Sequence, residues 1–267
     1  MLKASLNRIR SSALGKPARA SQRNPLFLAP PFTEDVVQAV RLISTRLALK
    51  ADERSRLLWQ KECNDAAFME YDALEPLLSQ MAKPKKILEI GPGLGRSCVV
   101  FGKMDVWAED AIVHLYDADG KQTKYKQEHY GQPPRWPDTS SFCGNSSLLK
   151  QMLEYNGLTN YEMFDAGKIE LKKLPGPYDL IYGFYSIGFH WSLENYLDDL
   201  DPLMDDRSVF LCTLNKYFVS FPRLRNYSTR ILRPGEVSQG LRAVDYLALS
   251  KGKLPEVGVT VSDAYPD

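Results

Sequence analysis

A glycine-rich turn between two apolar segments is the first place where this chain could do chemistry. Residues 85–101 read KKILEIGPGLGRSCVVF, and the turn itself, residues 89–96, reads EIGPGLGR. Three glycines in five positions allow a close approach of backbone to ligand, because glycine has no Cβ and adopts positive φ readily. Phosphate, dinucleotide and adenosyl ligands all bind to glycine turns of this general kind. The neighbouring residues must therefore decide between these ligands.

Two common nucleotide patterns do not fit the turn. The dinucleotide pattern GxGxxG would need a glycine at position 96, where the chain has Arg96. The Walker pattern ends in GKS or GKT, and the turn has no such lysine. What remains is a strand with Glu89 close to its end, which leads into Gly91, Gly93 and Gly95. This pattern predicts a tight turn whose backbone lies against a ligand, with a carboxylate at the strand end.

A second carboxylate follows the next expected strand. AIVHLYD (111–117) ends in Asp117, 22 positions after Gly95. In an open parallel sheet the carboxyl ends of neighbouring strands face the same crevice. A carboxylate there can accept hydrogen bonds from both hydroxyls of a ribose. Asp119, two residues further on, is an alternative for this role. The structural alternative is that Asp117 is a loop aspartate that only caps the next helix.

The turn ILEIGPGLGRS resembles the first motif of the Rossmann-like methyltransferases that use S-adenosylmethionine. The resemblance implies that Gly91, Gly93 and Gly95 approach the methionine and ribose parts of that cofactor. Glu89 would meet its amino group through a water molecule. Asp117 would bind the ribose. A glycine turn that only lets a strand and a helix pack is the structural alternative.

Later segments follow the same family pattern in the same order. NYEMFDA (160–166) resembles the third strand, whose end touches the adenine edge, and this position falls on Asp165 and Ala166. YDLIYGFYS (178–186) resembles the fourth strand, whose end borders both cofactor and substrate. A methyltransferase-like fold that serves as a non-catalytic binding subunit is the alternative from a different class. The intact glycines and Asp117 argue against it.

The elements around these motifs predict an α/β fold with a mainly parallel sheet. The resemblance implies a Rossmann-like methyltransferase fold with a mainly parallel seven-stranded sheet, here with a helical N-terminal extension. Residues 1–32 are expected to be a basic tail, 33–82 a helical subdomain or lid, and 83–267 the S-adenosylmethionine-binding domain. Thr33 is expected to cap a helix to about residue 50, and a second helical stretch, 53–81, to break near Asn64–Asp65 and Pro76. Further helices are expected at 146–157 and 192–204. The remaining strands are expected at 86–90, 208–214, 223–233 and 242–252, the last two as a hairpin at a sheet edge.

The methyl acceptor is indicated only by SIGFHWSLENYLDDL (186–200). This segment resembles sugar O-methyltransferases of bacterial polysaccharide pathways, which implies a sugar or glycan hydroxyl as the acceptor. A hydroxyl needs a base to take its proton, and a histidine has a suitable pKa. His190 is the first candidate, and a structural histidine stacked with Trp191 is the alternative reading. Another small metabolite, a lipid or a protein side chain stays open as the acceptor.

Other polar residues have further possible roles. His129 lies in a long insertion that could cap the acceptor, and Tyr130 and Trp136 of the same insertion could stack on a sugar. His114 lies inside a strand and is expected in the core. The acidic run around 198–201 is expected to be a solvated surface, and no metal site is expected.

Composition and charge indicate the class of protein and the compartment in which it works. Hydrophobic residues make up 44% and charged residues 25% of the 267 residues, as in soluble globular proteins. Four dispersed cysteines without a CxxC pair favour a reducing compartment, so we expect a cytoplasmic protein. Residues 1–33 hold six of the 34 Lys and Arg and no acid, which leaves 28 basic against 33 acidic residues elsewhere.

The acidic body and the basic tail bear on partners. Because the body is mildly acidic, no DNA or RNA partner is expected. The tail is open to three interpretations: a disordered segment, a peripheral contact with anionic lipid or another partner, or a mitochondrial transit peptide if the protein is eukaryotic. The sequence does not determine the oligomeric state.

Overall fold

The helices and strands alternate along the chain as the sequence predicts. The computed structural model describes residues 23–43, 49–118, 145–184, 186–187, 192–214, 222–232 and 245–259. The helices are α1 (Glu34–Ile43), α2 (Glu53–Leu78), α3 (Arg96–Lys103), α4 (Ser146–Tyr155) and α5 (Leu197–Leu200). The strands are β1 (Lys86–Ile90), β2 (Ile112–Asp117), β3 (Tyr161–Asp165), β4 (Leu180–Gly183), β5 (Val209–Leu214), β6 (Ser228–Leu232) and β7 (Asp245–Ser250).

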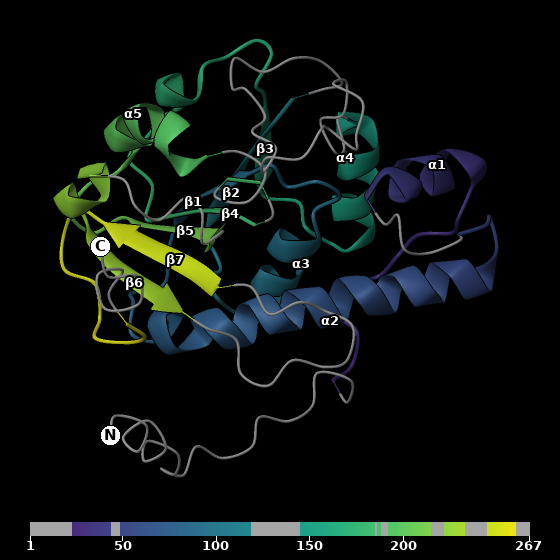
Figure 1. The fold of residues 1–267 in the computed structure, drawn as a ribbon. Coiled ribbons are helices and arrows are strands. Elements are labelled where there is room, and N and C mark those ends of the chain that lie inside the picture. Colours follow the sequence, from purple (N-terminus) through teal and green to yellow (C-terminus); the bar gives the residue numbers. More distant parts are fainter. Residues whose placement is uncertain are drawn as a thin grey trace, which may run out of the picture.

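These strands form one seven-stranded sheet in the order β3-β2-β1-β4-β5-β7-β6 (Figure 1). All pairs from β3 to β5 are parallel. β7 lies between β5 and β6 and is antiparallel to both. The prediction of a mainly parallel sheet that ends in an edge hairpin is therefore confirmed. Because β1 is central, the loops after β1, β2 and β4 emerge side by side at the carboxyl edge.

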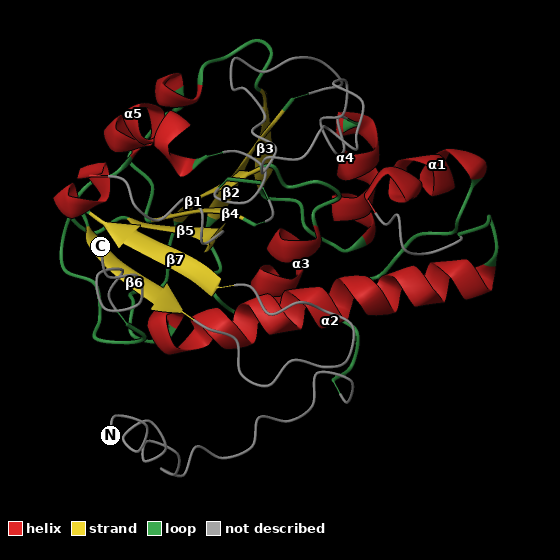
Figure 2. Cartoon of the chain, viewed as in Figure 1, coloured by secondary structure: helices red, strands yellow, loops and turns green. Residues whose placement is uncertain are grey.

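Helices cover both faces of the sheet (Figure 2). Side chains along a strand point alternately to the two faces. Ile87 packs in a core with α2, α3 and α4, whereas its neighbour Leu88 packs in a second core with α5 and the turns around it. Both side chains are fully buried. The central strands are therefore apolar on both faces, which is typical of parallel sheets.

The first helix begins where the sequence predicts. The hydroxyl of Thr33 accepts a hydrogen bond from the backbone N–H of Val36 at 3.3 Å. Glu34 and Asp35 occupy the first turn. Carboxylates are favourable there because the N-terminal end of a helix carries a partial positive charge.

α2 is one uninterrupted helix of 26 residues, so the expected breaks near Asn64–Asp65 and Pro76 are wrong. The helix continues through the buried Asn64, whose side-chain amide donates a 2.7 Å hydrogen bond to the carbonyl of Gln60, one turn earlier. Pro76 lies in the last turn, just before the helix ends at Leu78. Its missing N–H removes one backbone hydrogen bond, and only two helical residues follow it.

Residues 26–29, which we call the strap, run extended against α2 and α4. Their four backbone N–H groups donate to the side-chain amide oxygens of Gln60, Asn64 and Asn156 at 2.7–2.9 Å. The Phe27 side chain is fully buried and packs edge-on against a tryptophan of α2. The strap therefore satisfies its backbone with side chains rather than with a neighbouring strand.

Two expected elements differ from the structure. Residues 192–204, expected as one helix, fold as the short α5 between two 3-10 turns, Leu193–Asn195 and Asp201–Leu203. Pro202 stands at the start of the second turn and cannot continue the backbone ladder of α5, because it has no N–H. The first residues of the expected sixth strand form another 3-10 turn, Pro222–Asn226.

Candidate functional site

The glycine turn after β1 adopts the conformation that its glycines allow. Gly91, Gly93 and Gly95 have φ values of 69°, 59° and 76°, a region that residues with a Cβ rarely occupy. The N–H of Gly91 donates to the carbonyl of Tyr116 in β2 at 2.9 Å, and that of Gly95 donates to Pro92 at 2.9 Å. The turn is therefore closed on itself and anchored to the neighbouring strand.

Two of the three glycines are also required by packing. A Cβ on Gly91 would lie 2.9 Å from the Cβ of Ser186, and one on Gly95 would lie 2.6 Å from a methyl carbon of Leu153 in α4. The hydroxyl of Ser186 donates to the carbonyl of Ile90 at 2.9 Å. Packing of the protein itself thus accounts for part of the glycine pattern, as the structural alternative expects.

Glu89 is buried on the face of β1 that α3 covers. Its side chain accepts a hydrogen bond from the hydroxyl of Tyr182 at 3.2 Å. Burial raises the pKa of Glu89 to about 8, and the hydrogen bonds from Cys98 and Tyr182 only partly oppose this. Near neutral pH the group is therefore mostly protonated, with its proton held beside the glycine turn.

The ends of β2 and β3 place the other predicted residues along the same edge. Asp117 and Asp165 are partners in the parallel register, and the N–H of Ala166 donates to the carbonyl of Asp117 at 2.8 Å. The Asp117 carboxylate is partly exposed and accepts from the N–H of Ala118 at 2.8 Å. Asp165 accepts from the N–H of Gly167 at 2.8 Å. The glycine turn and these three residues therefore form one row across β1, β2 and β3.

Sequence reasoning missed a buried carboxylate that reaches this row from α2. Glu70 is 0% exposed, pairs with the guanidinium of Arg96 and accepts a 2.9 Å hydrogen bond from the hydroxyl of Ser97. Together with Glu89 these residues form what we call the buried ion cluster. A signal existed: Glu70 falls at helical spacing among Ala67, Ala73, Leu74 and Leu77, all of which are buried. An acid on the apolar face of a helix needs a partner.

The predicted acceptor-side residues lie outside the described part of the chain: His190, Trp191, His129, Tyr130 and Trp136. Asp119, the alternative to Asp117 for the ribose, lies outside it as well. His114 lies in the core, as expected: it is 3% exposed, and its Nδ1 lies 2.8 Å from the hydroxyl of Tyr178. Burial lowers the pKa of His114.

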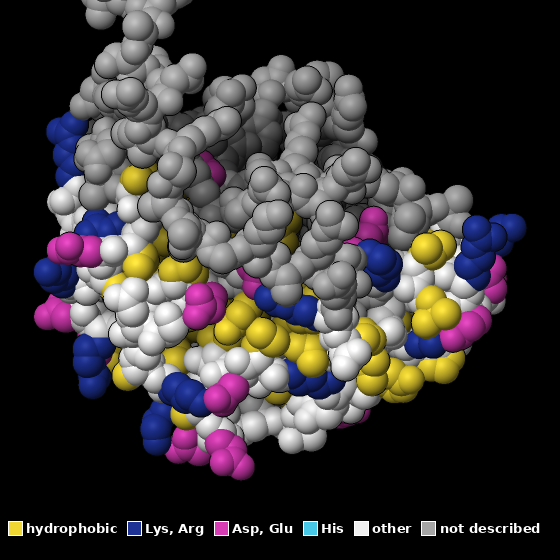
Figure 3. Space-filling model, turned by 90° about the horizontal axis from the view of Figure 1, so that it is seen from below, with side chains coloured by type: hydrophobic (Ala, Val, Ile, Leu, Met, Phe, Trp, Pro, Cys, Tyr) yellow, Lys and Arg dark blue, Asp and Glu magenta, His cyan; other side chains and the backbone are white. Residues whose placement is uncertain are grey.

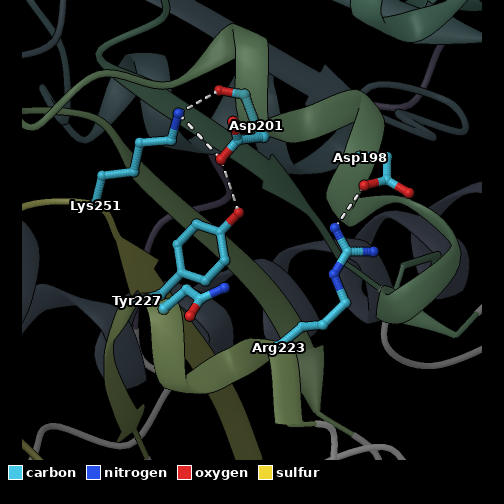
Figure 4. A pocket seen from close by; sticks show the side chains of 6 residues that line it. Asp198, Asp201, Arg223, Tyr227 and Lys251 are labelled. Atoms are coloured by element: carbon cyan, nitrogen blue, oxygen red, sulfur yellow. Dashed lines mark hydrogen bonds and ion pairs between the residues drawn. The ribbon is translucent and has the colours of Figure 1, made fainter.

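The acidic run after β4 forms a second polar region. A pocket there is lined by Asp198, Asp201, Arg223, Asn226, Tyr227 and Lys251 (Figure 4). Arg223 pairs with Asp198 at 2.5 Å, and the Asp201 carboxylate accepts from Tyr227 and Lys251 at 3.0 Å each. We call these five charged and hydroxyl-bearing residues the surface ion cluster. Tyr227 precedes β6 and Lys251 follows the antiparallel β7, so the cluster lies at the amino edge, opposite the glycine turn.

Other surface features can be stated for the described part of the chain. No helix in it has both the length and the hydropathy that crossing a bilayer requires. Within the same residues, no group of three or more His, Cys, Asp and Glu side chains is arranged to hold a metal. Figure 3, a view from below Figure 1, shows Lys and Arg interspersed with Asp and Glu over the described surface of that face.

Comparison with known proteins gave structural likeness only. The chain matches no protein-family model and no curated protein sequence. A provisionally named O-methyltransferase of Klebsiella pneumoniae shares 12% identity over 81% of this chain and 89% of its own, with a TM-score of 0.46. A precorrin-6y C5,15-methyltransferase of Geobacter metallireducens shares 12% over 67% and 86%, with a TM-score of 0.41. The M1A22 tRNA methyltransferase of B. subtilis shares 10% over 72% and 68%, with a TM-score of 0.44. Likeness at this level assigns no activity.

The class of fold follows from the topology of the chain itself. A sheet of order β3-β2-β1-β4-β5-β7-β6, with β7 antiparallel and a glycine turn after β1, is the Rossmann-like methyltransferase fold. The fold class predicted from the sequence is confirmed. A fold does not by itself determine a reaction, so the function must be argued from the site.

Proposed function

We propose that this chain is an S-adenosylmethionine-dependent methyltransferase that binds its cofactor along the carboxyl edge of β1, β2 and β3. The observation that carries the proposal is the closed glycine turn beside the partly exposed carboxylate of Asp117. In open parallel sheets, ligands bind outside the carboxyl ends of the strands. A ribose presents two hydroxyl donors, which suit a carboxylate in that position.

The residues at this edge fit the cofactor part by part. The backbone of Gly91–Gly95 would lie against the methionine and ribose of the cofactor, because its three glycines have no side chain that would keep the ligand away. Asp117 would accept from the ribose hydroxyls, and Asp165 with Ala166 would border the adenine. Glu89 would act on the amino group through water, as a buried group behind the turn.

Arg96 separates this cofactor from a dinucleotide. It stands where the dinucleotide pattern has its third glycine, which allows close packing of helix and strand around a pyrophosphate. Its guanidinium is paired with Glu70 in α2. Arg96, the first residue of α3, therefore contacts α2 of the helical extension.

We further propose that the acceptor is a sugar or glycan hydroxyl. When bound, the cofactor supplies a methyl group on a sulfonium, which is a good leaving group. The chain must then align the hydroxyl with that methyl group and take up its proton. His190 is proposed as this base, because it follows β4, whose end adjoins the end of β1. The resemblance of residues 186–200 to sugar O-methyltransferases supports the acceptor.

Calorimetric titration with S-adenosylmethionine tests the cofactor. Wild-type protein should bind it, and Asp117→Ala should weaken binding by about 1–3 kcal/mol, because charge-assisted hydrogen bonds are lost. Asp110→Ala is the matched control: this exposed acid precedes the opposite end of β2 and pairs with Lys85. Folded wild-type protein that binds no cofactor would refute the proposal. Equal affinity of both variants and wild type would remove Asp117 from the site.

Transfer of a labelled methyl group tests the acceptor. Cell-extract sugars and glycans should become labelled, and His190→Ala should lower turnover with little change in cofactor affinity. Label that appears instead in lipid, protein or RNA would reassign the acceptor while leaving the cofactor proposal intact. A fully active His190→Ala would make this histidine structural.

A further inference from the structure

Glu70 holds the first turn of α3 with both carboxylate oxygens. Its Oε1 accepts from Nη2 of Arg96, and its Oε2 accepts from Oγ of Ser97 at 2.9 Å. Arg96 and Ser97 directly follow Gly95, the residue that caps α3. Glu70 itself belongs to α2, outside the β1–α3 unit that forms the glycine turn. The contact therefore joins the helical extension to the end of that turn.

A charged group in this place needs a physical reason. Burial raises the pKa of Glu70, whereas Arg96 and Ser97 lower it. Replacing a buried ion pair by apolar side chains of similar volume is often neutral or stabilising, so such a pair is weak evidence for a role in stability. The N-terminus of α3, however, has no side-chain cap at Gly95 and no acid in its first turn. Glu70 supplies the negative charge that this helix end favours.

The other end of the turn is fixed by the sheet. The N–H of Gly91 bonds to β2, and Ser186 bonds to the carbonyl of Ile90. The far end, at Gly95, is continuous with Arg96 and Ser97, which Glu70 holds. The turn is thus held by the sheet at its start and by α2 at its end.

We propose that Glu70 is a positioning residue of the cofactor site: by holding Arg96 and Ser97, it fixes the end of the glycine turn against S-adenosylmethionine. The assignment rests on the proposed function. The helical extension then contributes to cofactor binding through one carboxylate, without touching the cofactor itself.

Two substitutions at the same position separate charge from packing. Glu70→Gln keeps the shape of the side chain and removes its charge, whereas Glu70→Asp keeps the charge and shortens the side chain. If Glu70 positions the turn through Arg96, Glu70→Gln should bind S-adenosylmethionine about tenfold more weakly or worse, since charge-assisted hydrogen bonds carry the contact. Glu70→Asp should retain more affinity than Glu70→Gln, because Arg96 can follow the shortened carboxylate. Glu53→Gln, which breaks an exposed pair with Arg56 on the same helix, should bind as wild type does.

Affinity is measured by calorimetry on folded protein, below the unfolding transition of each variant. Ser97→Ala covers the case in which the Glu70 variants do not fold; it should weaken binding in the same direction by about threefold. The assignment would be overturned if Glu70→Gln lowered only the unfolding temperature and kept the affinity of wild type. Ser97→Ala takes the place of Glu70→Gln in this test if the Glu70 variants do not fold. The reverse order, with Glu70→Asp binding more weakly than Glu70→Gln, would overturn the assignment as well. Wild-type protein that binds no cofactor would refute the proposed function and this assignment with it.

Discussion

The buried ion cluster and the surface ion cluster use the same chemistry in opposite surroundings. In the first, the side chains of Glu70 and Arg96 are 0% and 26% exposed; in the second, those of Asp198 and Arg223 are 80% and 40% exposed. Each is a carboxylate paired with a guanidinium. The first lies at the carboxyl edge of the sheet beside the glycine turn, and the second lies at the amino edge.

Their surroundings give the two pairs different energies. A pair in water contributes about 0–1 kcal/mol, because solvent screens the charges and two long side chains lose freedom. In a buried pair each charge has lost its hydration, so removing one partner leaves the other without compensation. These similar contacts therefore have different roles: the surface ion cluster is a solvated region, and the buried ion cluster joins α2 to α3 beside Glu89 of β1.

Removal of the buried guanidinium should give the largest effect. Arg96→Met leaves Glu70 buried next to Glu89 without its cation, and we expect the free energy of unfolding to fall by about 3–5 kcal/mol. Urea denaturation at neutral pH, followed by circular dichroism, measures this change. Arg223→Met is the matched control, with an expected loss below about 1 kcal/mol. Similar losses in both variants would show that burial does not distinguish the two clusters.

The pH dependence of stability should come from the buried ion cluster as well. The pKa of Glu89 is near 4.5 without the folded environment and about 8 in the folded protein. Between these values the folded state holds a proton that the unfolded state has released. Stability from this group is therefore complete below pH 4.5 and is lost as pH rises to 8, with a slope that approaches about 1.4 kcal/mol per pH unit.

Glu89→Gln isolates that contribution, because its neutral amide does not titrate. The difference in unfolding free energy between Glu89→Gln and wild type should grow in favour of the variant from pH 5 to pH 8. Glu109→Gln, at an exposed position, serves as the control. A difference that stays constant over this range would mean that Glu89 is ionised throughout.

The surface ion cluster should give the smallest effect. Asp198→Asn removes the exposed pair with Arg223, and we expect a loss of stability that is small and smaller still in 0.5 M salt. Thermal unfolding at low and high salt measures it. A loss of several kcal/mol that resists salt would make this cluster a structural element after all.

The sequence predicted those parts of the fold that depend on local pattern. The glycine turn, the apolar strands around it and Asp117 at the next strand end could be located because each has a short signature. The contacts of α2 could not, since they join residues far apart in sequence. The pair Asn64–Asp65 predicts a helix break, because asparagine and aspartate compete for backbone hydrogen bonds and favour caps and turns. In the structure the amide of Asn64 bonds the strap, which lies 37–38 residues away in sequence.

Glu70 shows the same limit at the candidate site. In the sequence it is one of many acids in a helix, and its burial arises only where α2 crosses α3, with Arg96 26 residues further on. The acceptor-side prediction at His190 concerns residues that the structure does not describe, so it stays a prediction. The carboxyl edge with its glycine turn and Asp117 could thus be located from the sequence, whereas the contact of α2 behind it could not.

The strap has a consequence for the order in which the molecule can form. Leu28 exchanges both of its backbone hydrogen bonds with Asn156, at a separation of 128 residues. During synthesis the strap is made before α2, whereas this partner is made 128 residues after Leu28. The other strap contacts, to Gln60 and Asn64, can form as soon as α2 exists. Docking of the strap can therefore begin on α2 and is completed only when the end of α4 is in place.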